Sequence, residues 1–230
     1  MFDHVTIQAT DQARTERFYA TVFDALPIGD WRRDLRIMQA AGAAQVTRHL
    51  HIAFVTESRD QVNAFWRTGV AAGYESDGAP GPREIYSDSY YGGFLLDPDG
   101  NSAEAVHHGR KRRPGSSIDH LWIGVSDLDD ALRFWETVAP AAGLTLYGHR
   151  PERFHVGARD RSFALVANGR SPTCNLELGI EVGGADGVQA MLEAAGAAGR
   201  PKAGGDGVLG PDGTHVVPVA VRRPGAGLAG

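Results

Sequence analysis

The sequence contains an internal repeat, which limits the folds open to the chain more than any other feature. Residues 118–138 can be laid over residues 2–22 by a shift of 116 positions without a gap. The identical pairs are Asp3 and Asp119, His4 and His120, Ile7 and Ile123, Asp11 and Asp127, Arg17 and Arg133, Phe18 and Phe134, Thr21 and Thr137, and Val22 and Val138. The chain is therefore an internal duplication.

Each copy divides again into two units that start with a strand and a helix. Residues 2–9 alternate polar and apolar side chains, as a half-buried strand does. Thr10 or Asp11 can cap a helix that continues to the stop at Pro27, with Phe18, Tyr19, Val22 and Phe23 at helical spacing. A second start follows in each half, at 51–72 and at 176–198. We therefore expect four units of roughly 50–60 residues, which must pair to cover both faces of their small sheets and would enclose a cleft.

Composition excludes several classes of protein. A chain of 230 residues with 42% hydrophobic and 22% charged residues is long enough for a large core, and no apolar run approaches a membrane span of about 20 residues. The first residues do not resemble a signal peptide, so we expect a cytoplasmic protein. A single cysteine, Cys174, excludes an internal disulfide and a thiolate cluster. The net charge of −5 argues against a nucleic-acid partner.

The domain boundaries are predicted from the repeat and from composition. The basic run at residues 110–113 and the Pro-Gly-Ser-Ser that follows it predict a linker at 110–117. An N-terminal domain is then expected at 1–109 and a degenerate copy at 118–221. The glycine-rich end, 222–230, is predicted to be a mobile tail.

One stretch of the first half combines a tight turn with an unusual carboxylate. Residues 97–101, Asp-Pro-Asp-Gly-Asn, favour a turn between two strands. Glu104 then stands in a short Ala-Glu-Ala-Val strand, where an unpaired carboxylate is costly to bury. We therefore expect Glu104 to have a partner.

Three segments, in this order and spacing, resemble the vicinal oxygen chelate superfamily, which includes glyoxalases, bleomycin resistance proteins and extradiol dioxygenases. They are DHVTIQATDQARTERFYATVF, HIAFVT and GFLLDPDGNSAEAV. The resemblance is strong over 2–108 and weak over 118–220. It implies an α+β fold of four βαβββ modules arranged as two paired-module domains.

The resemblance also implies one divalent metal ion, bound by His4, His51 and Glu104. Two imidazoles and one carboxylate on neighbouring strands can hold Fe, Mn, Ni or Zn and leave positions open for substrate oxygens. His49 lies on the same strand face as His51 and is the alternative ligand. Glyoxalase I adds a glutamate in the last strand of the first unit, but no acidic residue stands between Asp34 and Glu57. A three-ligand site is therefore expected.

Further polar residues are candidates for contact with the substrate. We expect Tyr90, Tyr91 and His108 in catalytic roles and Arg83 and Tyr86 in substrate binding, with packing or exposure as the alternative. A tyrosine could donate to a developing oxyanion, and a histidine exchanges protons near neutral pH. Neighbouring strand residues point to opposite sides, so a regular strand would bring only one of the two adjacent tyrosines to the cleft.

The second half lacks a carboxylate at the position that corresponds to Glu104. Glu177 aligns with His51, and Val217 aligns with Glu104, so that His120, Glu177 and Val217 form the corresponding set. His215 lies on the same strand face as Val217 and is a candidate substitute. We expect the second half to be a structural partner or a cleft that has lost its ion.

These observations together favour an enzyme that acts on a small molecule chelated to a divalent metal through two adjacent oxygens. We lean towards glyoxalase-like lyase or isomerase chemistry. The alternatives are a ring-cleaving extradiol dioxygenase and a non-catalytic protein that binds an antibiotic or aromatic ligand. No membrane partner is expected, and a homodimer is compatible with the sequence.

Overall fold

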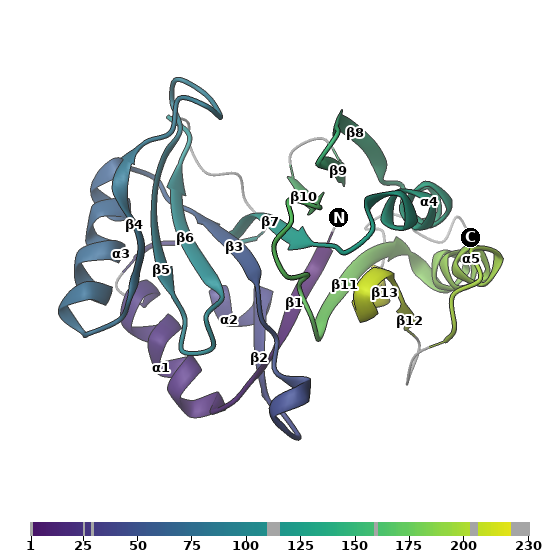
Figure 1. The fold of residues 1–230 in the computed structure, drawn as a ribbon, viewed down its shortest axis with the longest axis horizontal. Coiled ribbons are helices and arrows are strands. Elements are labelled where there is room, and N and C mark those ends of the chain that lie inside the picture. Colours follow the sequence, from purple (N-terminus) through teal and green to yellow (C-terminus); the bar gives the residue numbers. More distant parts are fainter. Residues whose placement is uncertain are drawn as a thin grey trace, which may run out of the picture.

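The computed structural model describes residues 2–24, 26–28, 30–109, 116–158, 161–202 and 207–221 (Figure 1). The first half contains β1 (Phe2–Ala9), α1 (Gln12–Phe23), α2 (Trp31–Asp34), β2 (Leu35–Gln39), the 3-10 helix η1 (Ala43–Gln45), β3 (Leu50–Val55), α3 (Arg59–Ala71), β4 (Ser76–Pro82), β5 (Tyr91–Leu96) and β6 (Ser102–His107). The second half contains β7 (Ile118–Gly124), α4 (Leu128–Val138), η2 (Ala139–Ala142), β8 (Thr145–Arg150), β9 (Arg153–Ala158), β10 (Arg161–Val166), β11 (Leu176–Gly183), α5 (Gly184–Ala197), β12 (Val208–Leu209), η3 (Pro211–Gly213) and β13 (His215–Val221). The mixed α+β fold of repeated strand–helix units is the one that the sequence predicts.

The repeated helices begin with the same cap. Asp11 accepts a hydrogen bond from the backbone N–H of Arg14 at the start of α1, and Asp127 does the same for Asp130 at the start of α4. An aspartate cap satisfies one of the backbone donors that the first helical turn leaves unpaired. The matched aspartates of the repeat therefore begin equivalent helices.

The strands form two sheets, and both sheets contain strands from both halves of the chain. The eight-stranded sheet has the order β4-β5-β6-β3-β7-β10-β9-β8, and the five-stranded sheet has the order β12-β13-β11-β1-β2. The first strands of two units pair antiparallel at the centre of each sheet, β3 with β7 and β1 with β11. The second unit therefore pairs with the third, and the first unit pairs with the fourth.

This pairing differs from the expectation that 1–109 and 118–221 each close their own sheet. β6 ends at His107 and β7 begins at Ile118, while β6 lies parallel to β3 on the side opposite to β7. The first strand of the second half therefore lies directly beside β3, which separates it from β6. The predicted linker and tail lie largely outside the described residues.

The helices, in contrast, pack within each half. α1 contacts α3, α4 contacts α5, and the two pairs lie at opposite ends of the molecule (Figure 1). Strand β3 buries Leu50, Ile52 and Phe54 in the main core, and its alternate residues face the other side of the sheet. No helix within the described ranges is both long and apolar enough to span a membrane.

Candidate metal centre and its cleft

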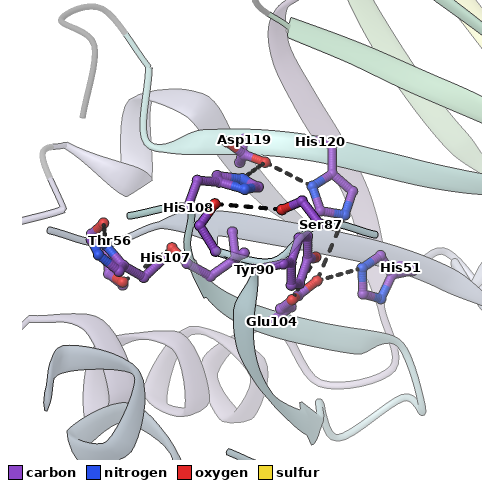
Figure 2. Close-up of polar contacts among 11 residues, drawn as sticks. His51, Thr56, Ser87, Tyr90, Glu104, His107, His108, Asp119 and His120 are labelled. Carbon is purple, nitrogen blue, oxygen red and sulfur yellow. Dashed lines mark hydrogen bonds and ion pairs between the residues drawn. The ribbon is translucent and has the colours of Figure 1, made fainter. Parts of the chain in front are cut away.

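Three side chains converge on the face of the eight-stranded sheet that the helices leave open. His51 of β3, Glu104 of β6 and His120 of β7 each offer a ligand atom, and these atoms lie within 4.8 Å of one another (Figure 2). Oε2 of Glu104 is 3.0 Å from Nε2 of His51 and 3.6 Å from Nε2 of His120. The two imidazoles therefore face the same carboxylate oxygen.

The strand register explains why these residues meet. Ala53 of β3 lies opposite Glu104 in the parallel pair with β6 and opposite His120 in the antiparallel pair with β7. His51 is two residues from Ala53 and shares its face of the sheet. Because Ala53 has a small side chain, it leaves room for the three larger side chains around it.

Glu104 is fully buried and accepts a second hydrogen bond at its other oxygen. The hydroxyl of Tyr90 donates to Oε1 at 2.8 Å. Burial, and then the charge of Glu104, raise the pKa of Tyr90 well above its ordinary value. Tyr90 therefore stays protonated and holds the carboxylate in place.

The two imidazoles have outer partners as well. Nδ1 of His51 lies 3.2 Å from the hydroxyl of Ser102, which donates to Asp77 at 2.7 Å, and Nδ1 of His120 lies 2.8 Å from Oδ2 of Asp119. Metal-binding histidines commonly have such partners on the nitrogen that does not bind the ion. Two imidazoles and a buried carboxylate, each held by an outer partner, suit a divalent transition metal.

Electrostatics in this region are governed by Asp119. Burial raises the pKa of Asp119, but the hydrogen bonds from His108 and His120 lower it by more. The pKa of Asp119 therefore lies well below its ordinary value. Burial lowers the pKa of His120, but the hydrogen bond and charge of Asp119 and the charge of Glu104 outweigh this and raise it. The negative charge of the partly buried Asp119 thus stabilises positive charge at the cluster.

The strand register supplies no fourth carboxylate at the equivalent position. β10 places Ala164 opposite Trp122, as β6 places Glu104 opposite Ala53. The sequence predicts no acidic ligand from the segment between Asp34 and Glu57. On β10, the strand that pairs with β7, the equivalent position is likewise not acidic, because it is Ala164. Three protein ligands leave coordination positions open for other groups.

The cluster lies in a cleft of about 950 Å³. Aromatic side chains line it on both sides, with the ring centroid of Tyr86 6.0 Å from that of Trp122 and the ring of Phe94 6.0 Å from that of His51. Arg83 and Arg170 also line the cleft. The volume and lining suit a small molecule with an apolar or planar part.

Most of the residues selected from the sequence line this cleft. They are Arg83, Tyr86, Tyr90, His108, His51 and Glu104, together with the alternative ligand His49, which is outside the three-residue cluster. Tyr91 does not fit its expected catalytic role, because its hydroxyl donates to Asn63 on α3 at 3.0 Å and so points away from the cleft. The alternation of a regular strand separates it from Tyr90.

His4 is the expected ligand that the structure does not bring to Glu104. It lies on β1 of the five-stranded sheet, where Nε2 is 3.6 Å from Oε1 of Glu177 and 3.1 Å from Nη1 of Arg36. His120 lies beside Glu104 instead, because the second unit pairs with the third rather than with the first. The repeat could have indicated His120 as a ligand, because it aligns His120 with His4.

The five-stranded sheet contains the equivalent positions with different chemistry. Glu177 stands in the place of His51, Val217 in that of Glu104 and Arg36 in that of Ala164. His215 contacts Glu177, with Nδ1 2.9 Å from Oε2. A guanidinium and an ion-paired glutamate thus occupy the positions that are equivalent to the metal cluster.

Comparison with known proteins gives one family and a set of similar folds. The model of the Glyoxalase/Bleomycin resistance protein/Dioxygenase superfamily matches residues 1–105. Glyoxalase I from Zea mays is 18% identical, with a TM-score of 0.66 over 95% of this chain and 92% of that chain. A glyoxalase/bleomycin resistance protein from Albidiferax ferrireducens is 26% identical, with a TM-score of 0.41 over 46% of this chain and 98% of that chain. No curated protein sequence matches.

Proposed function

We propose that the chain is a divalent-metal enzyme of the glyoxalase/bleomycin resistance protein/dioxygenase superfamily, whose model matches residues 1–105, and that it acts on a small molecule chelated through two adjacent oxygens. The observation that carries the proposal is the convergence of His51, Glu104 and His120 on the floor of the cleft. His120 replaces His4 in the ligand set expected from the sequence. Fe, Mn, Ni and Zn all suit these donors.

The residues around the cluster have distinct tasks in this proposal. When bound, the ion supplies Lewis acidity to the substrate oxygens. Tyr90 keeps Glu104 in position through its hydroxyl, and Trp122 and Phe94 exclude water on either side of His51. His108 lines the cleft and is held at Nε2 by Asp119, which leaves Nδ1 to exchange a proton with the substrate.

We propose lyase or isomerase chemistry of the glyoxalase type as the first candidate, because His108 lines the cleft that holds the cluster and an imidazole can serve as a general base or acid. Ring-cleaving dioxygenase chemistry is the second candidate. It is favoured by the aromatic lining of Tyr86, Phe94 and Trp122 and by the three-ligand set, which would hold an ion able to take further oxygen ligands.

Metal content and turnover test the proposal. Protein purified without added metal is expected to contain about one divalent ion per chain by elemental analysis, as a single three-ligand cluster implies. Glu104→Gln and His120→Ala are expected to lose the ion, whereas His4→Ala, the matched control, keeps it. A metal-free wild type that takes up no added ion, or unchanged occupancy in Glu104→Gln, would contradict the proposal.

Substrate panels then separate the candidate activities. Hemithioacetals of 2-oxoaldehydes test isomerase chemistry, and catechols with an oxygen electrode test ring cleavage. Loss of turnover in His120→Ala, with turnover retained in His4→Ala, is the expected pattern. An aromatic ligand that binds stoichiometrically and is recovered unchanged, with no turnover in either panel, would instead indicate a binding protein and overturn the enzymatic proposal.

A further inference from the structure

Asp119 connects two histidines of the cleft through one carboxylate oxygen. Its Oδ2 lies 2.8 Å from Nδ1 of His120 and 2.9 Å from Nε2 of His108 (Figure 2). An ionised carboxylate only accepts hydrogen bonds, so both nitrogens donate to it. Asp119 thus specifies which nitrogen of each ring carries a proton.

The consequence for His120 is a defined tautomer. With a proton on Nδ1, the neutral ring has its lone pair on Nε2, the nitrogen that lies 3.6 Å from Oε2 of Glu104. A histidine binds a metal through an unprotonated nitrogen. The contact with Asp119 therefore orients the ring and directs its lone pair towards the cluster.

An irregularity of the backbone makes this contact possible. Consecutive residues of a regular strand point to opposite faces, which would separate Asp119 from His120. In the pairing of β3 with β7, Ala53 lies opposite His120 but Phe54 lies opposite Ile118, so Asp119 is an extra residue at a β-bulge. Bulges redirect side chains in this way and recur beside active sites.

We propose that Asp119 is a positioning residue that holds His120 with Nε2 directed at the metal and at the same time fixes His108 at the edge of the cleft. This inference rests on the proposed function, because it requires an ion at His51, Glu104 and His120. The contact acts through His120, since Asp119 is not a member of the three-residue cluster.

The repeat provides a matched control. Asp3 precedes His4 as Asp119 precedes His120, and Oδ1 of Asp3 lies 2.7 Å from Nδ1 of His4. The same bulge occurs there, since Phe2 lies opposite Ile180 and His4 opposite Gly179. Asp3→Asn therefore makes the same chemical change in the same backbone setting, away from Glu104.

Cobalt binding gives the first test. Wild-type, Asp119→Asn and Asp3→Asn proteins are stripped of metal and titrated with Co²⁺, and the visible absorption of the bound ion is recorded. Asp119→Asn is expected to bind Co²⁺ about 10–100-fold more weakly, with a changed absorption spectrum, as is typical for loss of an outer partner. Asp3→Asn is expected to match the wild type in both. Equal affinity and spectrum in Asp119→Asn and wild type would overturn the inference.

A second measurement does not depend on the variant folding. In zinc-loaded wild-type protein labelled with ¹⁵N-histidine, His120 is expected to show a protonated Nδ1 and a metal-bound Nε2. The opposite arrangement would overturn the role of Asp119 even if Asp119→Asn were unstable. If the wild type binds neither cobalt nor zinc, the proposed metal site itself has failed, which distinguishes that outcome from a failure of this inference alone.

Discussion

At the scale of single residues, Glu104 depends on a glycine that leaves space for it. A Cβ atom added to Gly92 would lie 2.3 Å from Oε1 of Glu104 and 3.2 Å from the ring of Tyr90. Both neighbours are buried and joined by a hydrogen bond, so neither can move without breaking that contact. The absence of a side chain at Gly92 is therefore a condition for the geometry of the cluster.

We predict that Gly92→Ala displaces Glu104 and weakens metal binding at least tenfold. Overpacking of this kind is also expected to lower the free energy of unfolding by about 1–3 kcal/mol. Metal titration and urea denaturation measure the two effects. Gly196→Ala in α5 is the control, because an added Cβ there meets no atom within 4 Å. Normal metal affinity in Gly92→Ala would show that the carboxylate tolerates a shift.

Residue types predicted part of the site, and strand pairing decided the rest. Glu104 and His51 belong to one unit, and the family resemblance of the segments around them was enough to select both. The third ligand depends on which first strand lies beside β3, and the repeat gives β1 and β7 the same Asp-His pair at the same position. Local patterns cannot distinguish His4 from His120, because the choice is made by contacts between distant parts of the chain.

At the scale of elements, Glu177 joins three strands of the five-stranded sheet. Thr6 of β1 donates to its Oε1 at 2.8 Å, His215 of β13 lies 2.9 Å from its Oε2, and His4 of β1 lies 3.6 Å from its Oε1. The contact with His4, opposed by burial and assisted by Thr6 and His215, lowers the pKa of Glu177 to about 2. The ionised carboxylate of Glu177 on β11 thus links this strand to β1 and β13.

The sign of this pKa shift predicts the pH dependence of stability. Because the pKa is depressed in the folded state, Glu177 stabilises the protein above its ordinary value of 4.5, and this contribution is lost as the pH falls towards 2. Glu177→Gln is expected to lower the free energy of unfolding by about 1–2 kcal/mol at pH 7 and by much less near pH 2. Urea denaturation across this range measures it, with the exposed Glu136→Gln as control. A loss that is equal at both ends of the range would indicate a packing effect instead.

At the scale of the whole molecule, the halves are separate in their helices and joined in their sheets. α1 packs with α3 and α4 with α5, but β3 pairs with β7 and β1 with β11 across the division. The sequence predicted the number of units and their strand–helix order. It could not predict the pairing, since any two first strands of the repeat offer the same alternating pattern. The predicted boundary between the domains 1–109 and 118–221 stays a prediction, and dividing the chain there tests it.

The proposed ligand set predicts that neither half binds the metal by itself. Residues 1–109 contain His51 and Glu104, whereas His120 lies in residues 110–230. The cut also separates both central strand pairs, which leaves β1 and β3 of the first fragment and β7 and β11 of the second with exposed edges. We expect the two fragments, refolded together from denaturant, to bind Co²⁺ with the spectrum of the intact chain, and each fragment alone to bind it at least tenfold more weakly.

A fragment 110–230 that carries His120→Ala is the control for this experiment, because it can complete both sheets without supplying the third ligand. Its mixture with 1–109 is expected to recover helical circular dichroism but not the cobalt spectrum. If 1–109 alone bound Co²⁺ as tightly as the intact chain, then His4 would be the third ligand and the first two units would close on each other in solution. The experiment therefore tests the pairing of the units and the composition of the site together, because the central antiparallel pair of β3 and β7 determines both.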